Sequence, residues 1–164
     1  LQIALSNATE ILTFNYHNLT PGGAIHALGE AVDYKGDPFV PVAQQPVLSY
    51  RLDDLISQFS IPEPTHLKID VDGIELDILK GAAQTLRNPS VKSILIEIEE
   101  GHDESEKIKE YITSCGLEFH SKHKYVHGGD TGPFSGIYNY IFHRAGDSSS
   151  DAAQDLESAN IGTD

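Results

Sequence analysis

The sequence predicts an α/β fold, with a largely parallel sheet that an antiparallel hairpin closes at the C-terminal side. Three observations favour this fold. Residues 67–71 form a short apolar run that ends in Asp70 and Asp72 and turns at Gly73 into a segment with helical spacing. From residue 51 onward, helical and strand-like segments alternate, which is typical of parallel strands joined by crossover helices. The last two strand-like segments frame a glycine-rich loop, residues 127–133, which indicates a hairpin.

The N-terminal part is expected to be mainly extended. Residues 2–5 form a short apolar strand, and residues 11–16 alternate between apolar and polar positions, which predicts a half-exposed strand in a hairpin. Residues 18–46 hold many glycines and prolines, so we expect a long loop with one short strand near residues 39–42. Loops of this length are commonly functional, which makes this segment a candidate cover for a substrate.

A helix is predicted to follow an extended stretch at residues 47–50. The apolar positions take helical spacing at Leu52, Leu55, Ile56 and Phe59. Asp53 and Asp54 suit the first turn of this helix because the helix dipole favours acids there. Pro62 and Pro64 follow the segment and end it.

The remaining elements alternate in type. We expect a strand at 67–71, a helix from Glu75 that continues or restarts at 81–83, a strand at 91–99, a helix at 104–114, and short strands at 117–121, 124–127 and 137–143. The segment 91–99 is nearly all apolar, so it is predicted to be covered on both faces.

Composition favours one globular domain, residues 1–144, followed by an acidic, serine-rich tail, residues 145–164, that is expected to be disordered. The formal net charge of −14 argues against binding to nucleic acid. Cys115 is the single cysteine, so the chain has no internal disulfide. The sequence has no apolar run of about 18 residues, the length that a membrane span needs. Location is left open by the sequence, with the cytoplasm favoured.

The acids after the strand at 67–71 are the candidate catalytic residues. Asp70 closes an apolar strand, where it can accept a proton from a hydroxyl group or hold a divalent cation. Asp72 lies one alternation further along, and Glu75 opens the next helix, where a capping role is the alternative. Glu99 ends the neighbouring predicted strand, so its carboxylate either faces the same site or is solvated.

The stretch Lys68-Ile69-Asp70-Val71-Asp72-Gly73-Ile74-Glu75, continued by Leu79-Lys80-Gly81-Ala82, resembles the signature of the FkbM-like methyltransferases. Three flanking segments fit as well: Ile3-Ala4-Leu5-Ser6, Leu52-Asp53-Asp54-Leu55 and Asn139-Tyr140-Ile141-Phe142. The resemblance covers residues 2–144. It implies the Rossmann-like fold of class I S-adenosylmethionine-dependent methyltransferases and methyl transfer, commonly to a hydroxyl oxygen. It also implies that Leu5, Ser6 and Asp70 contact the cofactor.

By this resemblance the chain begins near the third strand of the family's sheet, and a missing N-terminal segment would supply the glycine-rich cofactor turn. The first two strands of that sheet lie between the third and the fourth. Without them, residues 2–5 would lack neighbours and the inner edge of residues 67–71 would be exposed. We therefore expect poor independent stability unless the leading strand pairs directly with the acid-bearing one.

Other functions remain open at this point. Asp70 and Asp72 also suit the Asp-x-Asp metal site of a nucleotide-sugar glycosyltransferase, and a calcium loop or a non-catalytic remnant are further alternatives. His120, His123 and His127 could form a zinc site only if the chain brings them together. The expected acceptor is a small molecule or a sugar.

Overall fold

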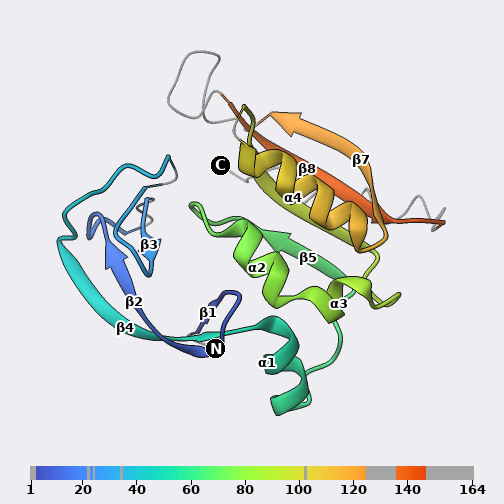
Figure 1. Cartoon of the computed structure of the whole chain (residues 1–164), viewed down its shortest axis with the longest axis horizontal. Coiled ribbons are helices and arrows are strands. Elements are labelled where there is room, and N and C mark those ends of the chain that lie inside the picture. The colour runs from blue at the N-terminus through green and yellow to red at the C-terminus, as the bar shows by residue number, and fades with distance from the viewer. Residues whose placement is uncertain are drawn as a thin grey trace. The chain divides into compact units, whose positions relative to one another are not determined.

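The computed structural model describes residues 3–21, 23, 25–33, 35–101, 103–124 and 136–146. The chain divides into two units, residues 1–62 with 70–85 and residues 63–69 with 86–164. Within the described residues, each unit contains one four-stranded sheet (Figure 1). The α/β class is therefore confirmed. A single Rossmann-like sheet was expected, but the strands form two mixed sheets, and the Rossmann-like arrangement stays a prediction. The glycine-rich loop at 127–133 and the tail from residue 147 lie outside the described residues.

The first sheet has the strand order β1-β4-β2-β3. Its strands are β1 (Ala4–Leu5), β2 (Glu10–Tyr16), β3 (Ala27–Leu28) and β4 (Ala43–Tyr50). β2 runs antiparallel to both β3 and β4, as the alternation in residues 11–16 predicts. β1 pairs in parallel with β4. The expectation that the leading strand would lack a neighbour, or would pair with the acid-bearing strand, is therefore wrong.

β4 is longer than the extended stretch predicted at residues 47–50, since it begins at Ala43 and includes Pro46. The prediction of a strand near residues 39–42 is wrong, since these residues form no strand and β4 begins only at Ala43. The carbonyl of Tyr50 accepts the amide of Ser6 at 3.0 Å, so the backbone groups of Tyr50 point toward β1. Backbone groups alternate in direction along a strand, and those of Pro46, four residues earlier, therefore point to the same side. β1 pairs only with Ser49 and Tyr50, so Pro46 lies beyond its end. A proline without an amide proton is tolerated at such an open edge.

The first unit also contains helices. These are α1 (Leu52–Phe59), α2 (Glu75–Gly81) and the start of α3 (Ala83–Arg87). The predicted helix after Glu75 thus stops at Gly81 and restarts at Ala83. A Cβ atom at Gly81 would lie 2.0 Å from the carbonyl oxygen of Ser6. Glycine at this position lets the backbone of α2 reach the residue that follows β1.

The second sheet has the strand order β5-β6-β8-β7. Its strands are β5 (His66–Ile69), β6 (Ser93–Glu99), β7 (Leu117–Lys124) and β8 (Ile137–Arg144), and the same unit contains α4 (Asp103–Ser114). β5 and β6 are parallel, whereas β6 with β8 and β7 with β8 are antiparallel, which confirms the predicted closing hairpin. Ile94, Leu95 and Ile96 are all buried, so β6 is covered on both faces as predicted.

The strand expected at 117–121 extends to Lys124, while residues 125–127 of the strand expected at 124–127 lie outside the described residues. β7 runs without a break from Leu117 to Lys124, with an irregularity in its pairing between Phe119 and Ser121. Such a bulge keeps a strand continuous while one residue is left out of the pairing. In the described part of the chain, no helix is both long and apolar enough to cross a bilayer.

Arg144 ties together the ends of several segments in the second unit. Its guanidinium group donates to the carbonyl oxygens of Val91, Cys115, Leu86 and Asn88, at distances between 2.6 and 3.0 Å. Leu86 belongs to the last turn of α3, and Cys115 follows α4. A cation is favourable there because helix C-termini carry unpaired carbonyl groups and partial negative charge. Burial lowers the pKa of Arg144.

We predict that Gly81→Ala destabilises the fold. The added methyl group would meet the Ser6 carbonyl at 2.0 Å, and both partners are backbone, so α2 or β1 must move. The expected loss is about 1–3 kcal/mol in the free energy of unfolding, measured by urea denaturation. Gly136→Ala is the matched control, since a Cβ there would meet its nearest atoms at an ordinary 3.8 Å. Equal stabilities of the two variants would contradict the close approach.

Candidate functional site

The acids predicted to carry the chemistry follow β5 directly. β5 ends at Ile69, Asp70 comes next, and Gly73 adopts a φ of 103° before α2 begins at Glu75. This left-handed conformation is readily available to glycine, which explains why the turn falls there. We call residues 70–75 the acid corner. Its three carboxylates lie in different surroundings.

Asp70 is exposed at the end of the strand. Asp72 is half-buried, and its Oδ2 accepts the backbone amide of Ile25 at 2.7 Å. Asp72 therefore connects the acid corner with the segment that precedes β3. Sequence spacing does not reveal this contact, because the two residues are 47 positions apart.

Glu75 makes a local contact. Its Oε1 accepts the amide of Gly73 at 3.2 Å, while Ile74, the residue before the helix, provides no side-chain cap. A carboxylate that reaches back to an amide before the first turn stabilises a helix start. The geometry agrees with the capping role considered for Glu75, and its catalytic role stays a prediction.

Leu5 and Ser6 lie at the end of β1, in the same unit as the acid corner. Leu5 is half-buried, whereas Ser6 is buried with 7% of its surface exposed. The amide of Ser6 donates to Tyr50, and its carbonyl faces Gly81. Glu99 belongs to the second unit, where it is the half-buried last residue of β6 and pairs with Ile137.

Metal binding has no support from side chains that the structure describes. Among those residues, no group of three or more His, Cys, Asp or Glu side chains could hold a metal ion. His120 stacks on His143 with ring centroids 4.2 Å apart, and His123 contacts Ser121 at 3.2 Å. His127, the third histidine considered for a zinc site, lies outside the described residues.

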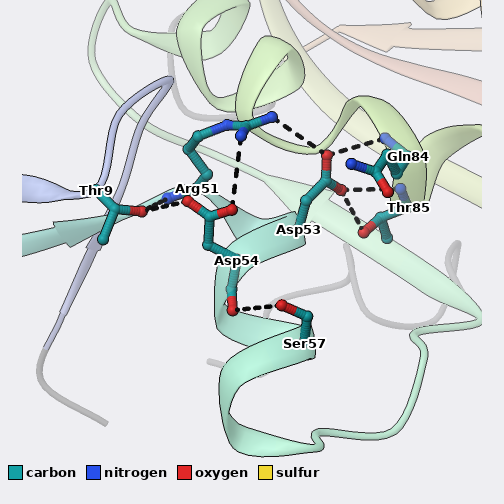
Figure 2. A network of polar contacts seen from close by, with 7 residues as sticks. All are labelled: Thr9, Arg51, Asp53, Asp54, Ser57, Gln84 and Thr85. Carbon is teal, nitrogen blue, oxygen red and sulfur yellow. Dashed lines mark hydrogen bonds and ion pairs between the residues drawn. The ribbon is translucent and has the colours of Figure 1, made fainter.

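A network around Asp53 joins three parts of the first unit (Figure 2). Asp53 lies in α1, yet its carboxylate accepts the amides of Gln84 and Thr85 at 3.0 and 2.9 Å and the Thr85 hydroxyl at 2.8 Å. It therefore caps the start of α3 rather than its own helix. Arg51 lies 3.7 Å from the Asp53 carboxylate. From the sequence, Asp53 was expected to interact with the dipole of its own helix, α1. No local pattern in the sequence indicates a partner 31 residues away.

The adjacent Asp54 connects the same network to Thr9, in the segment before β2. Its Oδ2 accepts the Thr9 hydroxyl at 2.6 Å, and Thr9 in turn accepts the amide of Arg51 at 3.2 Å. Asp54 also lies 3.5 Å from the guanidinium of Arg51. The two neighbouring acids thus fix α3 and the segment before β2, respectively, to the start of α1.

Glu100, which follows β6, lies in a second polar cluster that sequence reasoning did not single out. It accepts hydrogen bonds from Lys122, at 2.7 Å, and from the Tyr140 hydroxyl. The bond from Lys122, and then that from Tyr140, lowers the pKa of Glu100. Burial, followed by the contact with Glu100, raises the pKa of Tyr140 to about 12. A lowered pKa means that Glu100 stabilises the fold above its ordinary pKa, and that this contribution is lost as the pH falls through the lowered value.

We predict that Asp53→Ala costs about 1–3 kcal/mol of unfolding free energy, because two amides and a hydroxyl near the start of α3 lose their acceptor. The Asp53 side chain is only 4% exposed. Asp54→Ala is the control and should cost less than about 1 kcal/mol, since its side chain is 32% exposed and surface ion pairs contribute little. Thermal or urea unfolding measures both, and a larger loss for Asp54→Ala would refute the assignment.

Glu100→Gln should lower the pKa of Tyr140 from about 12, yet leave it above the ordinary 10.0, because burial persists. Ring-carbon NMR shifts of labelled tyrosine against pH measure the change, with Tyr140→Phe assigning the signal. Glu118→Gln, at an exposed acid of β7, should leave the midpoint unchanged. An unchanged midpoint in Glu100→Gln would show that the carboxylate has no influence on Tyr140.

Comparison with known proteins identifies the family. The family described as "Methyltransferase FkbM domain" matches residues 1–119. A hexuronic acid methyltransferase, AglP of Haloferax volcanii, is 37% identical over 57 residues, which are 35% of this chain and 23% of that protein. The match therefore spans about a quarter of the length of this relative. No solved structure matches the chain. Because the family match covers most of the sequence, the chain belongs to the FkbM methyltransferase domain family.

Proposed function

We propose that the chain is part of an S-adenosylmethionine-dependent methyltransferase that methylates a hydroxyl oxygen, and that Asp70 is its general base. The observation that carries this proposal is the exposure of Asp70 at the end of β5, within the stretch that resembles the family's signature. Asp72 and Glu75 are half-buried and each accepts a backbone amide, and Asp70 is the exposed acid of the corner. An exposed carboxylate after a strand of an α/β protein suits contact with a substrate.

The cofactor supplies a methyl group on a sulfonium, so the protein mainly has to position the acceptor and take up its proton. Asp70 would accept that proton from the hydroxyl as the new carbon–oxygen bond forms.

Two of the three predicted cofactor positions are at least partly exposed, which supports their assignment to ligand contact. Leu5 is half-buried and offers an apolar surface for an adenine ring, and the carboxylate of Asp70 is exposed. Ser6 is buried and its peptide groups face Tyr50 and Gly81, so we assign it to the support of Leu5 rather than to direct contact.

The proposed acceptor is a sugar hydroxyl. The relative from Haloferax volcanii is named for hexuronic acid, which carries both hydroxyl groups and a carboxylate. The corner itself is acidic, and the chain has a formal net charge of −14. Like charges repel at short range, so a hydroxyl rather than the carboxylate of such a sugar would face Asp70.

The open edges of two strands suit completion by further strands of a methyltransferase domain. Within the described residues, β1 has β4 as its neighbour and β5 has β6. Unpaired backbone groups at such edges readily accept another strand. We assign these edges, each taken within its own unit, to pairing with strands of the N-terminal segment that the family resemblance implies.

The test is methyl transfer from S-adenosylmethionine to D-glucuronic acid, followed by release of S-adenosylhomocysteine. Asp70→Asn should lower kcat by about 10²–10⁴-fold, the usual contribution of a general base. The affinity for S-adenosylhomocysteine, measured by calorimetry, should change by less than about tenfold, because at most one hydrogen bond is lost. Asp77→Asn is the control, since Asp77 contacts Lys80 at 3.3 Å on α2.

Wild-type activity in Asp70→Asn would refute the assignment of the base. Calorimetry with uridine diphosphate and Mn²⁺ tests the alternative that the chain is a glycosyltransferase. Binding of that pair in place of S-adenosylhomocysteine would overturn the proposed function, and binding of neither would favour a non-catalytic remnant.

A further inference from the structure

The contact between Asp72 and Ile25 joins the acid corner to a strained backbone. Ile25 has a φ of 66°, in the left-handed region. This conformation is unfavourable for a β-branched residue and persists only where the surroundings hold it. The Ile25 amide donates to Asp72 at 2.7 Å, a short bond to a charged acceptor.

The residues after Ile25 are anchored to the first sheet. Ala27 and Leu28 form β3 and pair with Asn15 and Phe14 of β2. The buried side chain of Asn15 donates to the carbonyl of Gly29 at 2.9 Å. Residues 25–29 are thus bound to the sheet by backbone and side-chain hydrogen bonds, and to the acid corner through Asp72.

His26 lies within this segment, and its ring contacts residues of β2 and the residue that follows this strand. Its ring packs edge-on against Phe14 and Tyr16, with centroids 5.8 and 5.4 Å away. Its Nδ1 accepts the amide of His17 at 3.3 Å. The segment therefore presents a half-buried aromatic group next to the residue that Asp72 holds.

We propose that Asp72 is a positioning residue, which clasps residues 25–29 to the acid corner and so fixes one wall of the acceptor site beside Asp70. This inference rests on the proposed methyl transfer. It gives Asp72 a different role from Asp70, although both were predicted as catalytic acids. His26 and Tyr16 are aromatic side chains that carry polar atoms, a kind of side chain that commonly lines small-molecule sites.

Amide hydrogen exchange tests the clasp without any need for activity. In Asp72→Ala, the Ile25 amide loses its acceptor and should exchange about 10- to 100-fold faster. In Asp72→Asn, the side-chain oxygen can still accept this amide, so exchange should stay within a few-fold of wild type. Asp77→Ala, an acid of α2 outside the clasp, should leave it unchanged. Slow exchange at Leu55 of α1 in the first unit, together with Ile94 of β6 in the second, shows that each variant is folded.

Kinetics then separates positioning from chemistry. Asp72→Ala should raise the KM for D-glucuronic acid about tenfold or more and change kcat less, while Asp72→Asn should resemble wild type. Unchanged Ile25 exchange in Asp72→Ala would overturn the clasp. Intact exchange with a large loss of kcat in Asp72→Asn would also overturn it, because the charge would then act in the chemistry. Absence of methyl transfer in wild type would refute the proposed function alone, since the exchange measurement still decides the clasp.

Discussion

The close approach of two backbones, at Gly81 and Ser6, is the constraint on which the first unit depends. α2 begins at the acid corner and ends at Gly81, so the contact at Gly81 fixes where the corner lies relative to β1. A side chain at this position would separate the helix from the strand by several tenths of an ångström or more. The Gly-Ala pair at the end of the motif therefore has a packing function, and the acids at its start depend on it.

Three carboxylates of the first unit accept backbone amides outside regular secondary-structure pairing. Asp53 caps the start of α3, Asp72 holds Ile25, and Glu75 reaches back to Gly73. Amides at helix starts and in strained loops lack regular partners, and charged acceptors satisfy them strongly. The proposed chemistry is assigned to Asp70 because its side chain is exposed where β5 ends.

Much of the fold could be predicted from local patterns. Helical spacing identified α1 and α4, alternation identified β2, and the apolar run identified β6. Pairing could not be predicted in the same way, since periodicity does not specify which strand lies beside β1. The partners of Asp53 and Asp72, 31 and 47 residues away, were missed for the same reason. The acid corner itself was found because strand, acids, glycine and helix follow one another in the sequence.

The central claim is that the end of β1 and the acid corner form the site for an activated methyl donor and its acceptor. Titration of the ¹⁵N-labelled protein with S-adenosylhomocysteine, followed by amide chemical shifts, tests it most directly. The account predicts saturable shifts at Leu5, Asp70 and their chain neighbours, with none at Lys122 or Tyr140. Shifts confined to the Glu100 cluster, or no shifts at the end of β1 and the acid corner at saturating ligand, would contradict it.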